Sequence, residues 1–161
     1  MRRGPYVAVV GAGDADEELQ SVAESVGRGL GESGAVVLCG GLTGVMEAVC
    51  RGCRAAGGTT VGILPGDARS DANEFVDVAL ATGMGEMRNA LIVRAADVVV
   101  ALGGEYGTLS EVAFALKTGR PVVGYETWQL RKRGGAGYGI VRVDSADDAV
   151  AAALRLASVV T

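Results

Sequence analysis

Histidine is absent from this 161-residue chain, and aromatic residues, proline and cysteine are scarce. The lack of histidine excludes Ser-His-Asp triads, histidine general bases and histidine-ligated metal sites. No apolar run approaches the ~20 residues that a membrane-spanning helix needs. The charged start, residues 1–5, leads into a strand and a glycine turn instead of the apolar core of a signal peptide. We therefore expect a cytoplasmic protein with no membrane contact and no metal site.

The three cysteines are Cys39, Cys50 and Cys53. Cys50 and Cys53 have the spacing of a redox or metal-binding pair, but no second pair exists to complete a zinc site. They also fall inside an expected helix, over residues 44–56, and not at a helix start. We expect buried structural thiols, with a redox or metal role as the alternative.

Small residues dominate what is present, with 26 glycines beside many alanines and valines. This composition suits close packing of helices on a sheet. The length predicts a single domain, residues 1–161, that buries roughly 70% of its unfolded surface. The formal net charge of −4 argues against a general nucleic-acid-binding surface.

Continuous apolar runs alternate with amphipathic stretches along the whole chain. Strands are expected at residues 6–10, 35–39, 59–64, 75–79, 97–102, 121–125 and 140–143, and helices at 16–33, 44–56, 85–95, 107–118 and 145–157. The alternation predicts an α/β fold, a Rossmann-like, doubly wound, mainly parallel sheet with helices on both faces. The strands containing Val7, Val37, Val61 and Val99 should be central. Residues 128–139, rich in glycine and basic side chains, should form an exposed excursion.

The stretch from Leu102 to Glu111 (LGGEYGTLSE) is the most informative in the chain. A buried strand runs into a glycine-rich turn, and the turn opens a helix. Unpaired backbone N–H groups and the positive end of the helix dipole meet there, which suits a phosphate. The residues expected to contact the phosphate are Gly103, Gly104, Tyr106, Gly107 and Thr108, the last as a helix cap or through its hydroxyl.

A second junction of the same type contains Gly40, Gly41, Thr43 and Gly44. Parallel strands present their carboxyl ends to one edge of the sheet, so both junctions should line the same crevice.

The run Gly11-Ala12-Gly13 resembles the start of a dinucleotide-binding turn. It lacks the third glycine at Asp16, and no acidic residue ends the second strand to hold a ribose. We interpret Gly11 and Gly13 as a structural turn that also lines the crevice.

Two charged residues are candidates for chemistry. Glu111 lies one turn into the helix on the face of Thr108, and a carboxylate beside a phosphate repels the ligand, which suggests catalysis. The alternative is a first-turn acid that favours the helix dipole. Arg88 lies in a largely apolar stretch, where it could also be solvated or paired with Glu86 or Asp97.

Several motifs together resemble the LOG family, once named lysine decarboxylases. They are the stretches 39–46, 61–65, 87–90 and 103–111, in the family's order within residues 6–126. The resemblance implies a phosphoribohydrolase that cleaves the base from nucleoside 5′-monophosphates, with Arg88 and Glu111 as catalytic residues and no required cofactor. It also implies a homodimer or larger assembly, through helices 16–33 and 85–95.

Two departures are similar to the family's molybdenum-cofactor-carrier-like branch. Glu105 and Tyr106 lengthen the second glycine loop, and Asn89, also expected at the ligand, stands where a lysine is usual. The alternative function is therefore a carrier of molybdenum cofactor or another phosphorylated pterin or nucleotide. The ligand stays open among a nucleoside monophosphate, phosphate and molybdopterin, and Tyr106 either packs at the mouth of the site or stacks on a base. The basic run Arg131-Lys132-Arg133 is expected to be a solvated loop, with an oligomer contact or a lid as alternatives.

Overall fold

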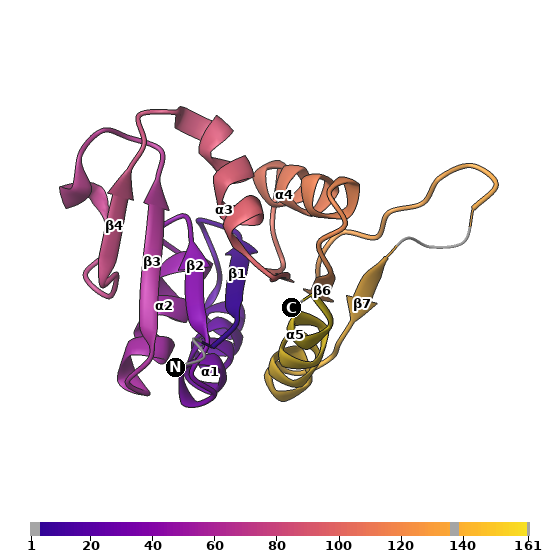
Figure 1. The fold of residues 1–161 in the computed structure, drawn as a ribbon, viewed down its shortest axis with the longest axis horizontal. Helices are drawn as coiled ribbons and strands as arrows, with labels where there is room; N and C mark the ends of the chain where they lie inside the picture. The colour runs from indigo at the N-terminus through magenta and orange to yellow at the C-terminus, as the bar shows by residue number, and fades with distance from the viewer. Residues whose placement is uncertain (1–3, 136–138, 161) are drawn as a thin grey trace.

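The computed structural model describes residues 4–135 and 139–160. Its seven strands form one parallel sheet with the order β4-β3-β2-β1-β5-β6-β7 (Figure 1). The strands are β1 (Tyr6–Gly11), β2 (Val36–Cys39), β3 (Thr59–Leu64), β4 (Val78–Ala81), β5 (Val98–Leu102), β6 (Val122–Tyr125) and β7 (Ile140–Arg142). The helices are α1 (Glu17–Glu32), α2 (Val45–Ala55), α3 (Asn89–Ala95), α4 (Tyr106–Lys117) and α5 (Ala146–Val160), with short 3-10 turns η1 (Arg69–Asp71) and η2 (Gly85–Arg88).

Helices cover both faces of the sheet because its central strands are apolar on both sides. In β1, Val7 and Val9 belong to one core with α1, α2 and α5. Ala8 and Val10 point the other way, into a second core with α3 and α4. The expected doubly wound α/β fold is confirmed. The strand order reverses between β1 and β5, the place where folds of this class bind ligands.

The fourth strand differs from its expected position over 75–79. Asp77 accepts a hydrogen bond from the backbone N–H of Thr60 through its carboxylate, at 2.9 Å, and the Thr60 hydroxyl donates to the Phe75 carbonyl at 2.8 Å. The side chains of Asp77 and Thr60 thus replace the backbone hydrogen bonds between the two strands at this point. Regular pairing with β3 begins only at Val78, opposite Val61.

The helix expected over 85–95 is also divided. Gly85 has φ of +58°, outside the right-handed helical region, and its backbone N–H donates to the Pro65 carbonyl at 2.9 Å. Residues 85–88 therefore form the 3-10 turn η2, and the α-helix α3 begins at Asn89.

Helices α1 and α2 touch backbone to backbone. A Cβ on Gly27 would overlap the Val49 carbonyl, and a Cβ on Gly52 would overlap the Glu24 carbonyl. Gly27 of α1 and Gly52 of α2 thus pack inside the molecule.

The segment between β6 and β7 extends away from the body of the molecule (Figure 1). It has no helix or strand in its described part, in agreement with the expected excursion at 128–139, of which residues 136–138 lie outside the described residues. Among the described helices, none combines the length and the apolar character needed to cross a membrane.

Candidate anion-binding site

The N-terminus of α4 carries no cap. Gly103 and Gly104 turn the chain out of β5 with φ of +58° and +109°, and Glu105 precedes the helix without a side-chain hydrogen bond to it. The first helical hydrogen bond is donated by Leu109. The N–H groups of residues 106–108 have no acceptor among the described residues, so the positive end of α4 is open to an anion.

Thr108 does not cap α4, contrary to one expectation, because it lies inside the first turn and Glu105 holds the cap position. Its side chain lies against Gly104, where a Cβ would overlap it. Thr108 is buried, and its hydroxyl forms no hydrogen bond with any described residue. That hydroxyl can therefore serve a ligand at the helix end.

The junction between β2 and α2 is partly closed by its own hydrogen bonds. Gly44, with φ of +66°, lies against the backbone of the turn after β1, and the Thr43 hydroxyl donates to the Gly13 carbonyl at 2.9 Å. The N–H of Val45 donates to Ala12 at 3.0 Å, and that of Gly41 to a cysteine sulfur at 3.3 Å. The first helical hydrogen bond of α2 is donated by Ala48, so the N–H groups of Met46 and Glu47 have no acceptor among the described residues, and this junction both shapes the site and leaves donors free.

The two glycine junctions lie at the same sheet edge, as expected. Gly11 connects them: a Cβ there would overlap the Leu102 carbonyl of β5 and the Val45 side chain of α2. Asn73, between η1 and β4 and part of no sequence motif, secures the second junction. Its backbone N–H donates to the Gly41 carbonyl at 2.9 Å and its side chain to the Leu42 carbonyl at 2.8 Å.

Arg88 is buried, whereas Met87 beside it in the chain is exposed. Its exposed fraction is 8%, whereas that of Met87 is 75%. The guanidinium lies against Gly40, where a Cβ would overlap Nη1, and its buried Nε has no hydrogen-bond partner. The expected alternatives are absent: neither Glu86 nor Asp97 pairs with it, and Asp97 instead accepts from the Tyr6 N–H at 2.8 Å. An unmet donor of this kind costs about 1–3 kcal/mol.

Glu111 completes the site from α4. It is 7% exposed, and burial raises the pKa of its carboxyl to about 7, against a smaller lowering by the charge of Arg88. Burial also lowers the pKa of Arg88, offset in part by Glu111. The two side chains share this electrostatic coupling but form no ion pair within 4.0 Å. We call Arg88, Thr108, Glu111 and the free amides of residues 106–108 the anion site.

The contacts of the cysteines differ from what the spacing of Cys50 and Cys53 suggests. Sγ of Cys39, at the end of β2, lies 3.4 Å from Sγ of Cys50, whereas Cys53 contacts the Thr59 carbonyl. A hydrogen bond from Cys50 lowers the pKa of Cys39, with smaller help from the Gly41 N–H and the charge of Arg88. All three thiols are free and buried. No cluster of three or more potential metal ligands occurs in the described part of the chain.

Two residues after β6, Thr127 and Trp128, lie at the site although no sequence motif indicated them. The Thr127 hydroxyl donates to the Gly103 carbonyl at 2.6 Å, and the Trp128 indole N–H donates to the Glu105 carbonyl at 3.2 Å. The rings of Trp128 and Tyr106 lie 5.6 Å apart between centroids. That Trp128 is the single tryptophan of the chain is the one signal that could have drawn attention to it. Asn89, half-buried beside Arg88, makes no side-chain hydrogen bond with the described residues.

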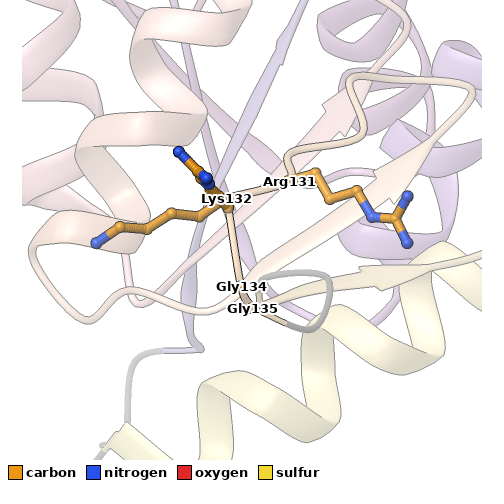
Figure 2. Close-up of a pocket in the computed structure, with 5 residues that line it drawn as sticks. Arg131, Lys132, Gly134 and Gly135 are labelled. Atoms are coloured by element: carbon orange, nitrogen blue, oxygen red, sulfur yellow. The ribbon is translucent and has the colours of Figure 1, made fainter.

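The basic run 131–133 lines a separate, open hollow of about 420 Å³ with Gly134 and Gly135. Figure 2 shows Arg131 and Lys132 extending in opposite directions from the loop. Their charges do not converge on one point, which agrees with a solvated loop.

Comparisons with known proteins agree with these features. Residues 4–152 match the model of the SLOG cluster4 family. The structure is similar to that of the molybdenum cofactor binding protein of Rippkaea orientalis, at 32% identity and a TM-score of 0.87 over 100% of both chains. It is also similar to the molybdenum cofactor carrier protein of Chlamydomonas reinhardtii, at 31% identity and a TM-score of 0.86 over 97% of this chain and 99% of that one. An uncharacterised protein of Archaeoglobus fulgidus is 46% identical over 116 residues, 72% of this chain and 76% of its own length. The resemblance to the LOG superfamily and its molybdenum-cofactor-carrier-like branch is confirmed.

Proposed function

We propose, from the premise that this chain belongs to the SLOG cluster4 family, that it is a carrier that binds a phosphorylated pterin of the molybdenum cofactor class. The observation that supports this most is the set of buried polar side chains without protein partners. Arg88, Thr108 and Glu111 are all buried, and none forms a hydrogen bond with a described residue. They lie beside the uncapped α4, so a phosphate would meet several unmet donors at once.

Two structural similarities that span nearly all of both chains support the cargo. The Rippkaea orientalis protein binds molybdenum cofactor, and the Chlamydomonas reinhardtii protein carries it. The negative charge of the cofactor's phosphate is complementary to the positive charge of Arg88 and of the N-terminus of α4. Arg88 would hold this phosphate, with the amides of residues 106–108 and the Thr108 hydroxyl as further donors.

Glu111 is compatible with this ligand. With a pKa of about 7, its carboxyl is close to half protonated at neutral pH. The protonated form does not repel a phosphate and donates a hydrogen bond to it. This weakens the argument from sequence that a glutamate here implies catalysis.

The second candidate is the phosphoribohydrolase, and Glu111 is the observation that favours it. An ionised carboxylate stabilises the cationic ribose that forms as the bond between C1′ and the base breaks. Water then adds to C1′, and its proton leaves with the base. A pKa of about 7 suits a carboxyl that must exchange a proton at neutral pH.

One experiment separates the two functions. Wild-type protein is titrated calorimetrically with molybdopterin and incubated with a panel of nucleoside 5′-monophosphates, and released base is scored. The carrier proposal expects molybdopterin binding without base release, and a loss of affinity of tenfold or more in Arg88→Ala. Arg28→Ala, whose exposed side chain pairs with Glu24 at 3.7 Å, is the control and should bind as wild type.

Two other results would contradict the proposed carrier function. Catalytic base release that disappears in Glu111→Gln would establish the hydrolase. If molybdopterin does not bind and no monophosphate releases its base, both functions are wrong.

We propose further that the protein forms a homodimer through η2 and α3. Met84, Met87 and Leu91 expose apolar side chains there, and Val78 and Leu80 do so on the edge strand β4. Exposed apolar groups gathered on neighbouring elements are typical of interfaces. A partner docked on η2 would lie next to Arg88 and shield the anion site.

A further inference from the structure

Tyr106 is exposed although it is a large aromatic residue in an ordered helix. It is the first residue of α4, and its exposed fraction is 77%. It contributes to neither apolar core. Core packing therefore does not explain its presence at this position.

Trp128 is fixed beside it by the glycine turn. Its indole N–H and the hydroxyl of the preceding Thr127 donate to the carbonyls of Glu105 and Gly103, at 3.2 and 2.6 Å. The same turn presents the free amides of the anion site. The aromatic pair and the phosphate donors are thus held by one short piece of backbone.

The geometry of the pair leaves ring surface available. The ring centroids are 5.6 Å apart and the planes are tilted by 37°, so the two rings do not cover each other face to face. Trp128 is half-buried and Tyr106 mostly exposed. Aromatic faces of this kind stack with planar heterocycles.

We propose that Tyr106 and Trp128 form the platform on which the planar ring system of the phosphorylated ligand stacks while its phosphate occupies the anion site. This inference rests on the proposed function, because it presupposes a ligand that carries both a phosphate and a heterocycle. Tyr106 serves the ligand twice, since its N–H is one of the free amides and its ring begins the platform. The pair thereby selects for ligands with a ring system over simple sugar phosphates.

The single tryptophan gives a direct readout. We expect adenosine 5′-monophosphate and a pterin monophosphate to quench Trp128 fluorescence, and ribose 5-phosphate, which has no ring system to stack, to bind without comparable quenching. Calorimetry measures the affinities independently of the absorption of the pterin.

The variants isolate the ring of Tyr106. Tyr106→Ala retains the backbone amide, so it should weaken the two heterocyclic ligands about tenfold or more and leave ribose 5-phosphate unchanged. Tyr106→Phe keeps the ring and should bind as wild type. Val159→Ala, an exposed apolar position at the far end of α5, is the matched control.

Three results overturn the inference. If Tyr106→Ala binds the heterocyclic ligands with wild-type affinity while Arg88→Ala does not, the platform is absent although the proposed function stands. If Tyr106→Ala weakens ribose 5-phosphate equally, Tyr106 supports the turn and not the ring. If wild-type protein binds none of these phosphates, the proposed function and the platform both fail.

Discussion

Burial of polar side chains is concentrated at the anion site. Among the described residues, four polar or charged side chains are buried: Thr60, Arg88, Thr108 and Glu111. Thr60 is explained by its hydrogen bonds to Phe75 and Asp77. The other three have no such partners and lie together, which is the pattern expected of a site that awaits a ligand.

The raised pKa of Glu111 makes stability depend on pH. Between the ordinary pKa of 4.5 and about 7, the folded protein holds a proton that the unfolded chain releases, so stability falls as pH rises through this window. Glu111→Gln removes the effect. Its free energy of unfolding relative to wild type should therefore rise by roughly 3 kcal/mol across the window, at about 1.36 kcal/mol per pKa unit, and level off above it.

Urea denaturation of both proteins at a series of pH values from 4 to 8 measures this difference. A constant offset between Glu111→Gln and wild type would contradict the buried, proton-binding carboxyl.

At the scale of elements, glycines decide how closely segments approach each other. Gly52 brings α2 against α1, Gly104 makes room for Thr108, and Gly107 faces open space in the first turn of α4. Replacement of glycine by alanine should therefore have a different energetic effect at each of these three positions.

Helical Gly→Ala changes should act in opposite directions at two of these positions. Gly52→Ala forces a Cβ into the Glu24 carbonyl and should destabilise the protein by about 2 kcal/mol or more. Gly107→Ala meets no atom within 4 Å and should stabilise it by about 0.5–1 kcal/mol, because alanine favours the helix. Thermal unfolding measures both. Equal shifts in Tm would show that α1 and α2 do not pack at backbone contact.

The turn at Gly104 should be indispensable for anion binding. At φ of +109°, with Thr108 where a Cβ would lie, Gly104→Ala must displace the turn and its free amides. We expect the affinity for a phosphorylated ligand to fall tenfold or more in calorimetry. Gly134→Ala is the matched control, because Gly134 also has positive φ but no neighbour within 4 Å. Wild-type affinity in Gly104→Ala would move the phosphate away from α4.

At the scale of the whole molecule, the strand order of the sheet brings the residues of the site together. Strands β1 and β5 are neighbours, and the chain leaves them toward opposite faces, so the loops after both strands meet at one edge. Helix α4 and turn η2 then bring Glu111 and Arg88 to the same place from separate parts of the chain. The apolar surface of η2 and α3 adjoins it.

The proposed dimer can be tested on that surface. Met87→Asp places a charge in the centre of the patch and should convert a dimer to a monomer in light scattering at micromolar concentration. Val159→Asp, exposed on α5, is the control and should leave the assembly unchanged. A wild-type protein that is monomeric under these conditions would refute the dimer.

The sequence by itself determined the elements and their layering. Apolar runs such as 6–10 and 97–102 and the helical periodicity between them are local patterns, and they produced the parallel sheet and both glycine junctions. The position of Thr108 and Glu111 on one helix face also follows from local spacing. These features depend on residues a few positions apart, which is why a linear reading captures them.

Only the tertiary structure decided what each junction does. At the α2 junction the Val45 N–H and the Thr43 hydroxyl donate to the turn after β1, whereas all of the first three N–H groups of α4 are free, although the local glycine patterns of the two junctions are alike. Arg88 turns inward while Met87 faces outward, against the usual preference of both residue types. Trp128 reaches the site, and Cys39 meets Cys50, through contacts set by strand order and helix packing. Such contacts join residues distant in the chain, and no local spacing encodes them.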